Sequence, residues 1–302
     1  MRNHIAKLVY IGTALLILST FASCQNKSDP TVPTEPSVIE ATKDQAVTAT
    51  QSDVTASAAS QVNTTPTITP TQAAASPSVE DVLSLGSSDP NNIYDATGFV
   101  NIKNVIPEAQ TEIRYATIHN FVGEVINGYD EPIAIMTKEA AAALMGANED
   151  LKEQGYTVKI FDAYRPQSAV NHFVSWSYDY GDQRMKSEFY PELDKASLFS
   201  SGYIASYSGH SHGSTIDLTL VDLGTGEEVD MGGSFDYFGT LSHPDYAGIS
   251  SEQYENRITL RNAMVSNGFS PLSTEWWHFS LNNDPYPYTY FDFPVSAASL
   301  SG

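Results

Sequence analysis

The alternation of hydrophobic and polar residues along the last two thirds of the chain predicts a small set of helices and strands. Helix-forming residues run from Glu139 to Gln154 and are followed by Gly155, which predicts a helix with a glycine after its last turn. Residues 156–161 alternate β-forming side chains, which predicts a strand that ends before Pro166. The same patterns predict four more elements: a helix over 168–178, a strand over 216–221, a helix over 252–267 and a strand over 276–281.

These helices and strands do not alternate strictly, which favours an α+β fold over a doubly wound α/β fold. Nearly all Tyr, Phe and Trp residues of the chain lie within 93–302. A segment of about two hundred residues with this composition suits one globular domain with its own core.

The composition changes sharply before this domain. Residues 25–92 are rich in Ser, Thr, Pro and Ala and contain almost no aromatic side chains. Such a segment buries too little apolar surface to offset the entropy lost on ordering, so it is expected to be a disordered linker. Its expected function is reach, carrying the domain away from a membrane and through a cell wall.

The first 24 residues have the features of an export signal. Arg2 and Lys7 flank the start, the apolar run 8–18 follows, and small residues precede Cys24. The run is too short for a spanning helix, so residues 1–24 are interpreted as a secretory signal. Cys24, the only cysteine, resembles the acylated residue of a bacterial lipobox, which predicts lipid anchoring at the extracytoplasmic face of the membrane. The alternative is an ordinary cleaved signal with an incidental cysteine.

The charge of the chain limits its partners. It carries 36 acidic and 15 basic residues, a formal net charge of −21 at pH 7. A surface this negative repels phosphate backbones, so nucleic acid is not an expected partner. With one cysteine no intrachain disulfide forms, and stability must come from packing or a metal.

Two histidine-containing segments are the candidates for chemistry. His210 and Asp217 lie seven residues apart, and Glu275 and His278 follow much later. Two imidazoles and one carboxylate are a ligand set that zinc favours, leaving a fourth position for water. A metal there lowers the pKa of water, and Glu275, three residues from a candidate ligand, is placed to take the proton. Taken separately, a His-rich loop is typical of a surface and Trp-Trp-His of core packing.

Taken together, the segments resemble a known family. The pattern S-x-H-x-x-x-x-x-x-D at Ser208, His210 and Asp217, followed by E-x-W-H at 275–278, resembles the signature of the zinc D-Ala-D-Ala peptidases. Within them the chain is most similar to the D-alanyl-D-alanine dipeptidases, which include the vancomycin-resistance dipeptidases. The resemblance extends over the domain in order: I-R-Y-A-T-x-x-N-F at 113–121, F-D-A-Y-R-P-Q at 161–167, M-G-x-x-F-D at 231–236 and D-P-Y-P-x-x-Y-F-D-F-P at 284–294.

This resemblance implies a mechanism and a fold. His210, Asp217 and His278 match the ligands of one zinc ion. Glu275 matches the general base, which takes a proton from water and passes it to the leaving amine. Arg165 matches the arginine that stabilises the oxyanion, although a structural ion pair is the alternative. The implied fold is a single zinc-peptidase domain over 93–302, resembling the Hedgehog/DD-peptidase fold.

The resemblance also implies how the substrate is held. Ser208, Tyr115 and Asp236 match residues that hold the two ends of a dipeptide. A free dipeptide is a zwitterion, so Asp236 suits its ammonium and Ser208 its carboxylate, although each could equally be a turn or cap residue. His212 and His119 depart from the family, where Arg and an acidic residue occur; His212 is expected to be a loop histidine near the site mouth, with a supporting contact to the site as the alternative.

Three functions are therefore considered. The first is zinc-dependent hydrolysis of D-Ala-D-Ala, a small D,D-dipeptide, to free D-alanine. The second is a D-Ala carboxypeptidase that trims cell-wall peptides, and the third is a non-catalytic, wall-binding lipoprotein. Export would place the enzyme outside the cytoplasm, which suggests D-alanine scavenging or processing of wall fragments rather than antibiotic resistance.

Overall fold

The computed structural model describes residues 77–301. The predicted export signal, Cys24 and residues 25–76 of the predicted linker lie outside the described residues. Within 77–301, no helix is both long and apolar enough to cross a membrane.

The domain is built on a five-stranded sheet with the order β2-β4-β5-β7-β6. The central strands are β4 (Tyr156–Asp162), β5 (Thr215–Asp222) and β7 (Glu275–Leu281), and the edges are β2 (Gln110–Thr111) and β6 (Phe269–Leu272). Only the short β2–β4 pair is parallel; the other pairs are antiparallel. A separate antiparallel pair joins β1 (Phe99–Asn101) to β3 (Ile135–Thr137).

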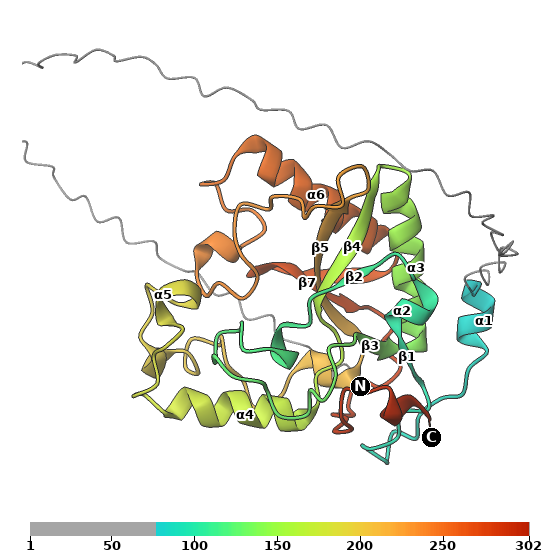
Figure 1. The fold of residues 1–302 in the computed structure, drawn as a ribbon, viewed down its shortest axis with the longest axis horizontal. Coiled ribbons are helices and arrows are strands. Elements are labelled where there is room, and N and C mark those ends of the chain that lie inside the picture. The colour runs from blue at the N-terminus through green and yellow to red at the C-terminus, as the bar shows by residue number, and fades with distance from the viewer. Residues whose placement is uncertain (1–76, 302) are drawn as a thin grey trace, which may run out of the picture. The chain divides into compact units, whose positions relative to one another are not determined.

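Two long helices pack against this sheet. Figure 1 shows α3 (Lys138–Lys152) and α6 (Ser251–Ser266) beside it, and they also contact each other. On the other side of the molecule lie α4 (Gln167–Tyr178) and the short α5 (Lys186–Phe189), away from α3. The remaining helices, α1 (Val79–Leu83) and α2 (Ile102–Val105), are one turn each.

Local sequence explains where the long helices begin and which face they bury. Thr137 caps α3 by accepting a hydrogen bond from the Ala140 backbone N–H, and Ser250 and Gln253 form a capping box at the start of α6. Small and apolar residues at helical spacing are buried on α3, among them Leu144 and Leu151. They pack into one hydrophobic core with the β5 side chains Leu218 and Leu220 and with Leu260 and Met264 of α6.

The six predicted elements are confirmed, with ends that differ by at most two residues. The expected mixture of helices and strands is confirmed as well. The sequence pattern missed β1, β2, β3 and β6, which have two to four residues each. Segments this short carry too few positions for a periodicity, and pairing with neighbouring strands defines them instead.

The structure moves the start of the domain upstream of the predicted boundary. Residues 77–92, predicted as part of the linker, instead belong to the folded domain. The side chain of Val82 in α1 is buried, and Ser78 and Asp81 form a capping box. The Lys138 ammonium contacts the Leu85 carbonyl, and the Tyr286 hydroxyl accepts a hydrogen bond from the Ser88 backbone N–H at 2.8 Å. The composition of this segment, rich in Ser and Pro, gave no indication that Val82 is buried.

A truncation tests this boundary. A protein that begins at residue 93 should unfold with a free energy at least ~3 kcal/mol lower than one that begins at residue 77, because it loses the buried Val82 side chain and several hydrogen bonds. Urea unfolding followed by circular dichroism measures the difference. As a control, Leu83→Ser, at an exposed position of α1, should change the free energy of unfolding of the protein that begins at residue 77 by less than ~0.5 kcal/mol.

Candidate active site

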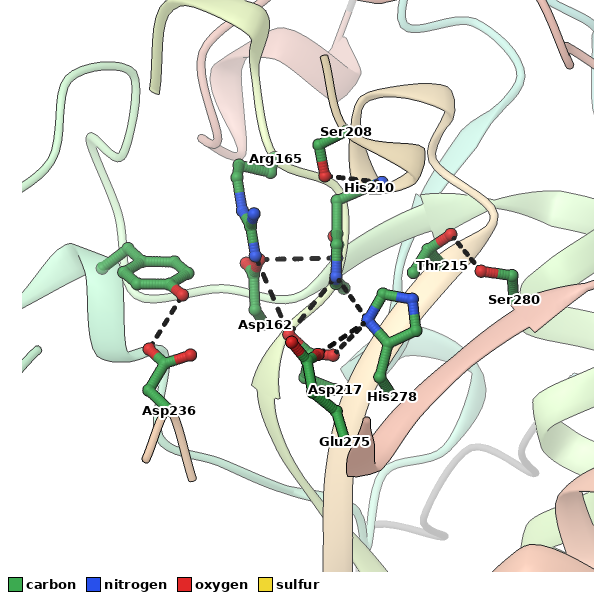
Figure 2. A network of polar contacts seen from close by, with 12 residues as sticks. Asp162, Arg165, Ser208, His210, Thr215, Asp217, Asp236, Glu275, His278 and Ser280 are labelled. Atoms are coloured by element: carbon green, nitrogen blue, oxygen red, sulfur yellow. Dashed lines mark hydrogen bonds and ion pairs between the residues drawn. The ribbon is translucent and has the colours of Figure 1, made fainter. Parts of the chain in front are cut away.

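Three side chains from different parts of the chain converge at one end of the sheet. Asp217 on β5 lies directly opposite His278 on β7 in the antiparallel register, so both side chains leave the same face. His210 comes from the 3-10 turn Gly209–His212 that precedes β5. Figure 2 shows the two imidazoles and the carboxylate pointing toward one another. Their candidate ligand atoms lie within 4.8 Å of one another.

The spacing of these atoms suits a tetrahedral metal. His210 Nε2 lies 3.3 Å from His278 Nδ1 and 3.3 Å from Asp217 Oδ2, and His278 Nδ1 lies 3.1 Å from Asp217 Oδ1. Bonds of ~2.0–2.1 Å to tetrahedral zinc separate the ligand atoms by about 3.3 Å. Asp217 Oδ1 is buried and makes no hydrogen bond with the described residues, which leaves a lone pair directed at this centre. The donor set therefore fits a zinc ion.

The orientation of His210 is set by the residue that follows β4. Its Nδ1 lies 2.8 Å from the Ala163 carbonyl oxygen, and a proton donated there leaves the Nε2 lone pair facing Asp217 and His278. The turn that carries it ends at Gly213, which has φ +80°. A Cβ at this position would lie 2.1 Å from the Phe99 ring, so only glycine fits.

Arg165 is held by Asp162, a residue to which sequence reasoning assigned no function. Arg165 Nε and Nη2 lie 2.9 and 2.8 Å from Asp162 Oδ2, and Nη2 lies 3.8 Å from Asp217 Oδ2. The Tyr129 hydroxyl donates to the other Asp162 oxygen at 2.5 Å. The ion pair considered from the sequence is thus present, yet the guanidinium also lines the cavity beside the candidate metal ligands. The acid three residues before Arg165 in F-D-A-Y-R-P was the available signal.

Tyr115 and Asp236 form a second group across the cavity. The Tyr115 hydroxyl donates to Asp236 Oδ2 at 2.8 Å, and both side chains are buried. Ser208 lines the same cavity, and its hydroxyl accepts a hydrogen bond from the His210 backbone N–H at 3.3 Å. Ser208 therefore caps the 3-10 turn, as one sequence-based alternative proposed, while facing the cavity.

The cavity that unites these groups has a volume of about 240 Å³. One part of its wall bears the charged and polar groups described above together with Glu275. Much of the remaining wall is aromatic and aliphatic and includes Phe121, Val170, Phe173, Tyr203, Ile204 and Phe238. A cavity that combines an apolar wall with a group of convergent polar side chains is typical of a small-molecule site.

Burial and mutual charge shift the acids of this site in different directions. Burial would raise the pKa of Asp217, but His210 and His278 outweigh it and hold that pKa well below its usual range. Burial raises the pKa of Glu275; the His278 side chain opposes the shift and the Asp217 carboxylate adds to it. Burial likewise raises the pKa of Asp236 well above normal. Glu275, whose Oε2 lies 3.5 Å from His278 Nδ1, thus has the affinity for a proton that a base requires.

The two histidines that differ from the family pattern, His212 and His119, lie outside the group of candidate metal ligands. His212 Nδ1 pairs with Asp284 Oδ2 at 2.9 Å, and its ring packs edge-on against Tyr290. It does not line the cavity. His119 lies on the surface, with Nε2 2.7 Å from Glu188 Oε1. Neither side chain contacts a candidate metal ligand.

Comparison with known proteins identifies the family. A family model described as D-Ala-D-Ala dipeptidase matches residues 95–296. The chain belongs to this family. The predicted family is confirmed, and the dipeptidase family is one of metallopeptidases, so the protein is an enzyme of this class.

Individual dipeptidases from distant bacteria are similar over the whole domain. The D-alanyl-D-alanine dipeptidase of Enterococcus faecium is 42% identical over 198 residues, which cover 66% of this chain and 98% of the relative. That of Streptomyces coelicolor is 39% identical over 198 residues, with the same coverage. That of Escherichia coli is 32% identical over 187 residues, covering 62% of this chain and 86% of the relative.

Metal binding tests the converging ligand set. We expect the purified protein to bind one zinc ion, and His278→Ala to weaken binding by more than the ~10–100-fold that loss of a ligand's supporting contact costs, because a bond to the metal is removed. Competition with a chromogenic chelator measures the affinity. His119→Ala, which removes an exposed imidazole, should bind as the wild type does. Equal affinity in the two variants would contradict the assigned site.

Proposed function

We propose that the protein hydrolyses D-Ala-D-Ala to two molecules of D-alanine. The similarity to D-alanyl-D-alanine dipeptidases over 98% of their length supports this reaction. The observation that carries the proposal is the convergence of His210, Asp217 and His278 beside Glu275 within one cavity.

His210, Asp217 and His278 would hold the zinc ion. When bound, zinc supplies Lewis-acid chemistry, lowering the pKa of water and polarising the carbonyl of the peptide bond. The burial of His210 and Asp217 excludes competing ligands from one side, and the cavity leaves the other side open to the substrate.

Glu275 and Arg165 would carry the chemistry of the chain itself. Glu275 takes one proton from the attacking water and delivers it to the peptide nitrogen as the carbon–nitrogen bond breaks. The Glu275 carboxylate is therefore regenerated at the end of each turnover. Arg165 faces the oxygen on which negative charge develops. The ion pair with Asp162 fixes the Arg165 guanidinium in this position. The rings of Tyr115 and Phe173, whose centroids lie 5.0 and 5.3 Å from its carbon, support it further.

Asp236, Tyr115 and Ser208 would select a free dipeptide. The Asp236 carboxylate meets the ammonium group while the Tyr115 hydroxyl fixes the carboxylate's orientation. The Ser208 hydroxyl, at the cavity wall, donates to the substrate carboxylate. The buried position of Asp236 favours a substrate whose amino end reaches the inner wall, which an acylated wall peptide does not present.

The protein's organisation is part of the proposal. We infer one zinc-peptidase domain of the Hedgehog/DD-peptidase fold, exported by residues 1–24 and anchored by a lipid on Cys24 at the outer face of the cell membrane. A linker between anchor and domain would give the enzyme reach through the wall. In that location its substrate would be dipeptide outside the cytoplasm, and its product would be D-alanine for reuse.

Loss of Glu275 tests the mechanism. Glu275→Ala should lower kcat for D-Ala-D-Ala by ~10²–10⁴-fold, the usual contribution of a general base, while zinc content stays at one per chain. Chelation of the metal should abolish activity in the wild type, and added zinc should restore it. Coupled detection of released D-alanine measures both, and undiminished turnover in Glu275→Ala would remove the assigned base.

The same assay separates the dipeptidase from a carboxypeptidase. Wall tripeptides and pentapeptides that end in D-Ala-D-Ala should be cleaved at least ~10²-fold less efficiently than the free dipeptide, since their blocked amino end leaves buried Asp236 without a partner. Comparable kcat/KM for the longer peptides would favour the carboxypeptidase.

Substitution of Cys24 tests the anchor. The wild type should fractionate with membranes and take up radiolabelled palmitate. Cys24→Ser should lose both properties, because the serine hydroxyl is not the substrate of thiol acylation. An unlabelled, membrane-free wild type with the domain fully active would contradict anchoring and leave the enzyme assignment intact.

A further inference from the structure

A buried arginine on α6 holds the loop that carries Asp236. Arg257 is 2% exposed, and its guanidinium donates hydrogen bonds to three backbone carbonyls. Nε donates to Met231 at 2.7 Å, Nη1 to His243 at 2.8 Å and Nη2 to Leu241 at 3.1 Å. These carbonyls lie on both sides of Asp236 in the sequence, so one side chain ties together the two ends of the loop 231–243.

The loop needs such a restraint because Asp236 has an unusual backbone conformation. It has φ +61°, and no other non-glycine residue of 77–301 has a positive φ. A residue in this region is strained and persists there only when its surroundings hold it. The preceding Phe235 is fixed by stacking on Phe161, with ring centroids 4.8 Å apart. Asp236 itself makes one side-chain hydrogen bond, from the Tyr115 hydroxyl.

Arg257 has no ionic partner in the described part of the chain. No carboxylate of 77–301 lies within 4.0 Å of its guanidinium, whose carbon lies 5.7 Å from the Trp276 ring centroid. All its close polar contacts are therefore with the backbone of this loop. The spread nitrogens of a guanidinium reach three separate carbonyls here, whereas the single nitrogen of a lysine ammonium is a point donor.

We propose that Arg257 is a positioning residue that fixes Asp236 where it meets the ammonium group of the dipeptide. The inference rests on the proposed function, in which Asp236 recognises that group. Loosening the base of the loop allows the strained backbone of Asp236 to relax and moves its carboxylate away from the cavity. The loss then falls on substrates with a free amino end, since Arg257 itself does not line the cavity.

Binding measurements isolate this effect from general destabilisation. The full chain with zinc carries the background change Glu275→Ala, which lowers turnover by ~10²–10⁴-fold, so binding is measured before hydrolysis consumes the ligand. Calorimetry compares its affinity for D-Ala-D-Ala with that for N-acetyl-D-Ala-D-Ala, which lacks the ammonium group. The parent should prefer the free dipeptide. Adding Arg257→Lys should lower this preference about tenfold, the effect of one misplaced charged hydrogen bond, with little change for the acetylated ligand.

The matched control lies one turn further along α6. Arg261 is partly exposed and its Nη1 lies 3.4 Å from Asp245 Oδ1, so Arg261→Lys should leave the preference unchanged. If Arg257→Lys lowers the affinity for both ligands equally, Arg257 has only a general structural role, and the inference fails. If the Glu275→Ala parent binds the free and the acetylated dipeptide equally well, Asp236 does not recognise the ammonium group, and the inference fails as well.

A second variant covers the case in which Arg257→Lys does not fold. Ser242→Ala removes the hydroxyl that contacts the Tyr237 carbonyl within the same loop, and it should reduce the preference in the same direction. An unchanged preference in that variant would likewise overturn the inference. Hydrolysis of D-Ala-D-Ala by the wild type is scored separately, so failure of the proposed function is distinguished from failure of the positioning role.

Discussion

The antiparallel pairing of β5 with β7 is the constraint on which the site depends. It sets Asp217 opposite His278 and so brings together a carboxylate and an imidazole separated by sixty-one positions in the sequence. A slip of one residue would turn one of the two side chains to the opposite face of the sheet. The register is supported next to the site by the hydrogen bond between the Thr215 and Ser280 hydroxyls at 2.8 Å. The candidate ligands Asp217 and His278 are therefore held as rigidly as the sheet itself.

The charges gathered around this pair would favour the binding of cations. Four acids, Asp162, Asp217, Asp236 and Glu275, surround one guanidinium, that of Arg165. Burial raises the pKa of three of them, Asp162, Asp236 and Glu275, which reflects the cost of concentrating negative charge in a poorly solvated space. A divalent ion between the histidines and an ammonium group beside Asp236 would relieve that cost. The electrostatic excess, unfavourable by itself, would thus contribute to the binding of these cations.

Sequence reasoning succeeded where a pattern was long or carried by specific motifs, and failed where tertiary contact decides. The hydrophobic pattern alone predicts the helices α3 and α6 and the strands β4, β5 and β7. The motifs that contain histidine, aspartate and glutamate identify candidate residues that line the cavity. Asp162 was overlooked because a polar residue at the end of a strand is ordinary, and its importance comes from the contact with Arg165. The α1 segment was assigned to the linker because a single buried side chain, Val82, cannot be recognised in a composition. Arg257 carried no signal, since its partners are backbone carbonyls that any sequence supplies.

The two halves of the site are held in different ways, and this has a consequence for specificity. The candidate metal ligands lie on strands or on a turn capped by Ser208, whereas Asp236 lies on a loop whose backbone is strained and which depends on contacts from α6. Substitutions in loop 231–243 or in the wall residues 202–205 can therefore alter substrate binding without displacing the candidate metal ligands. Changes in the strands move both the candidate ligands and the packing of Phe235 on Trp277, whose ring centroids lie 5.4 Å apart. If Asp217, Glu275 and His278 on the strands carry the proposed chemistry and Asp236 on its loop carries recognition, a change of substrate requires far less of the fold to change than a change of reaction.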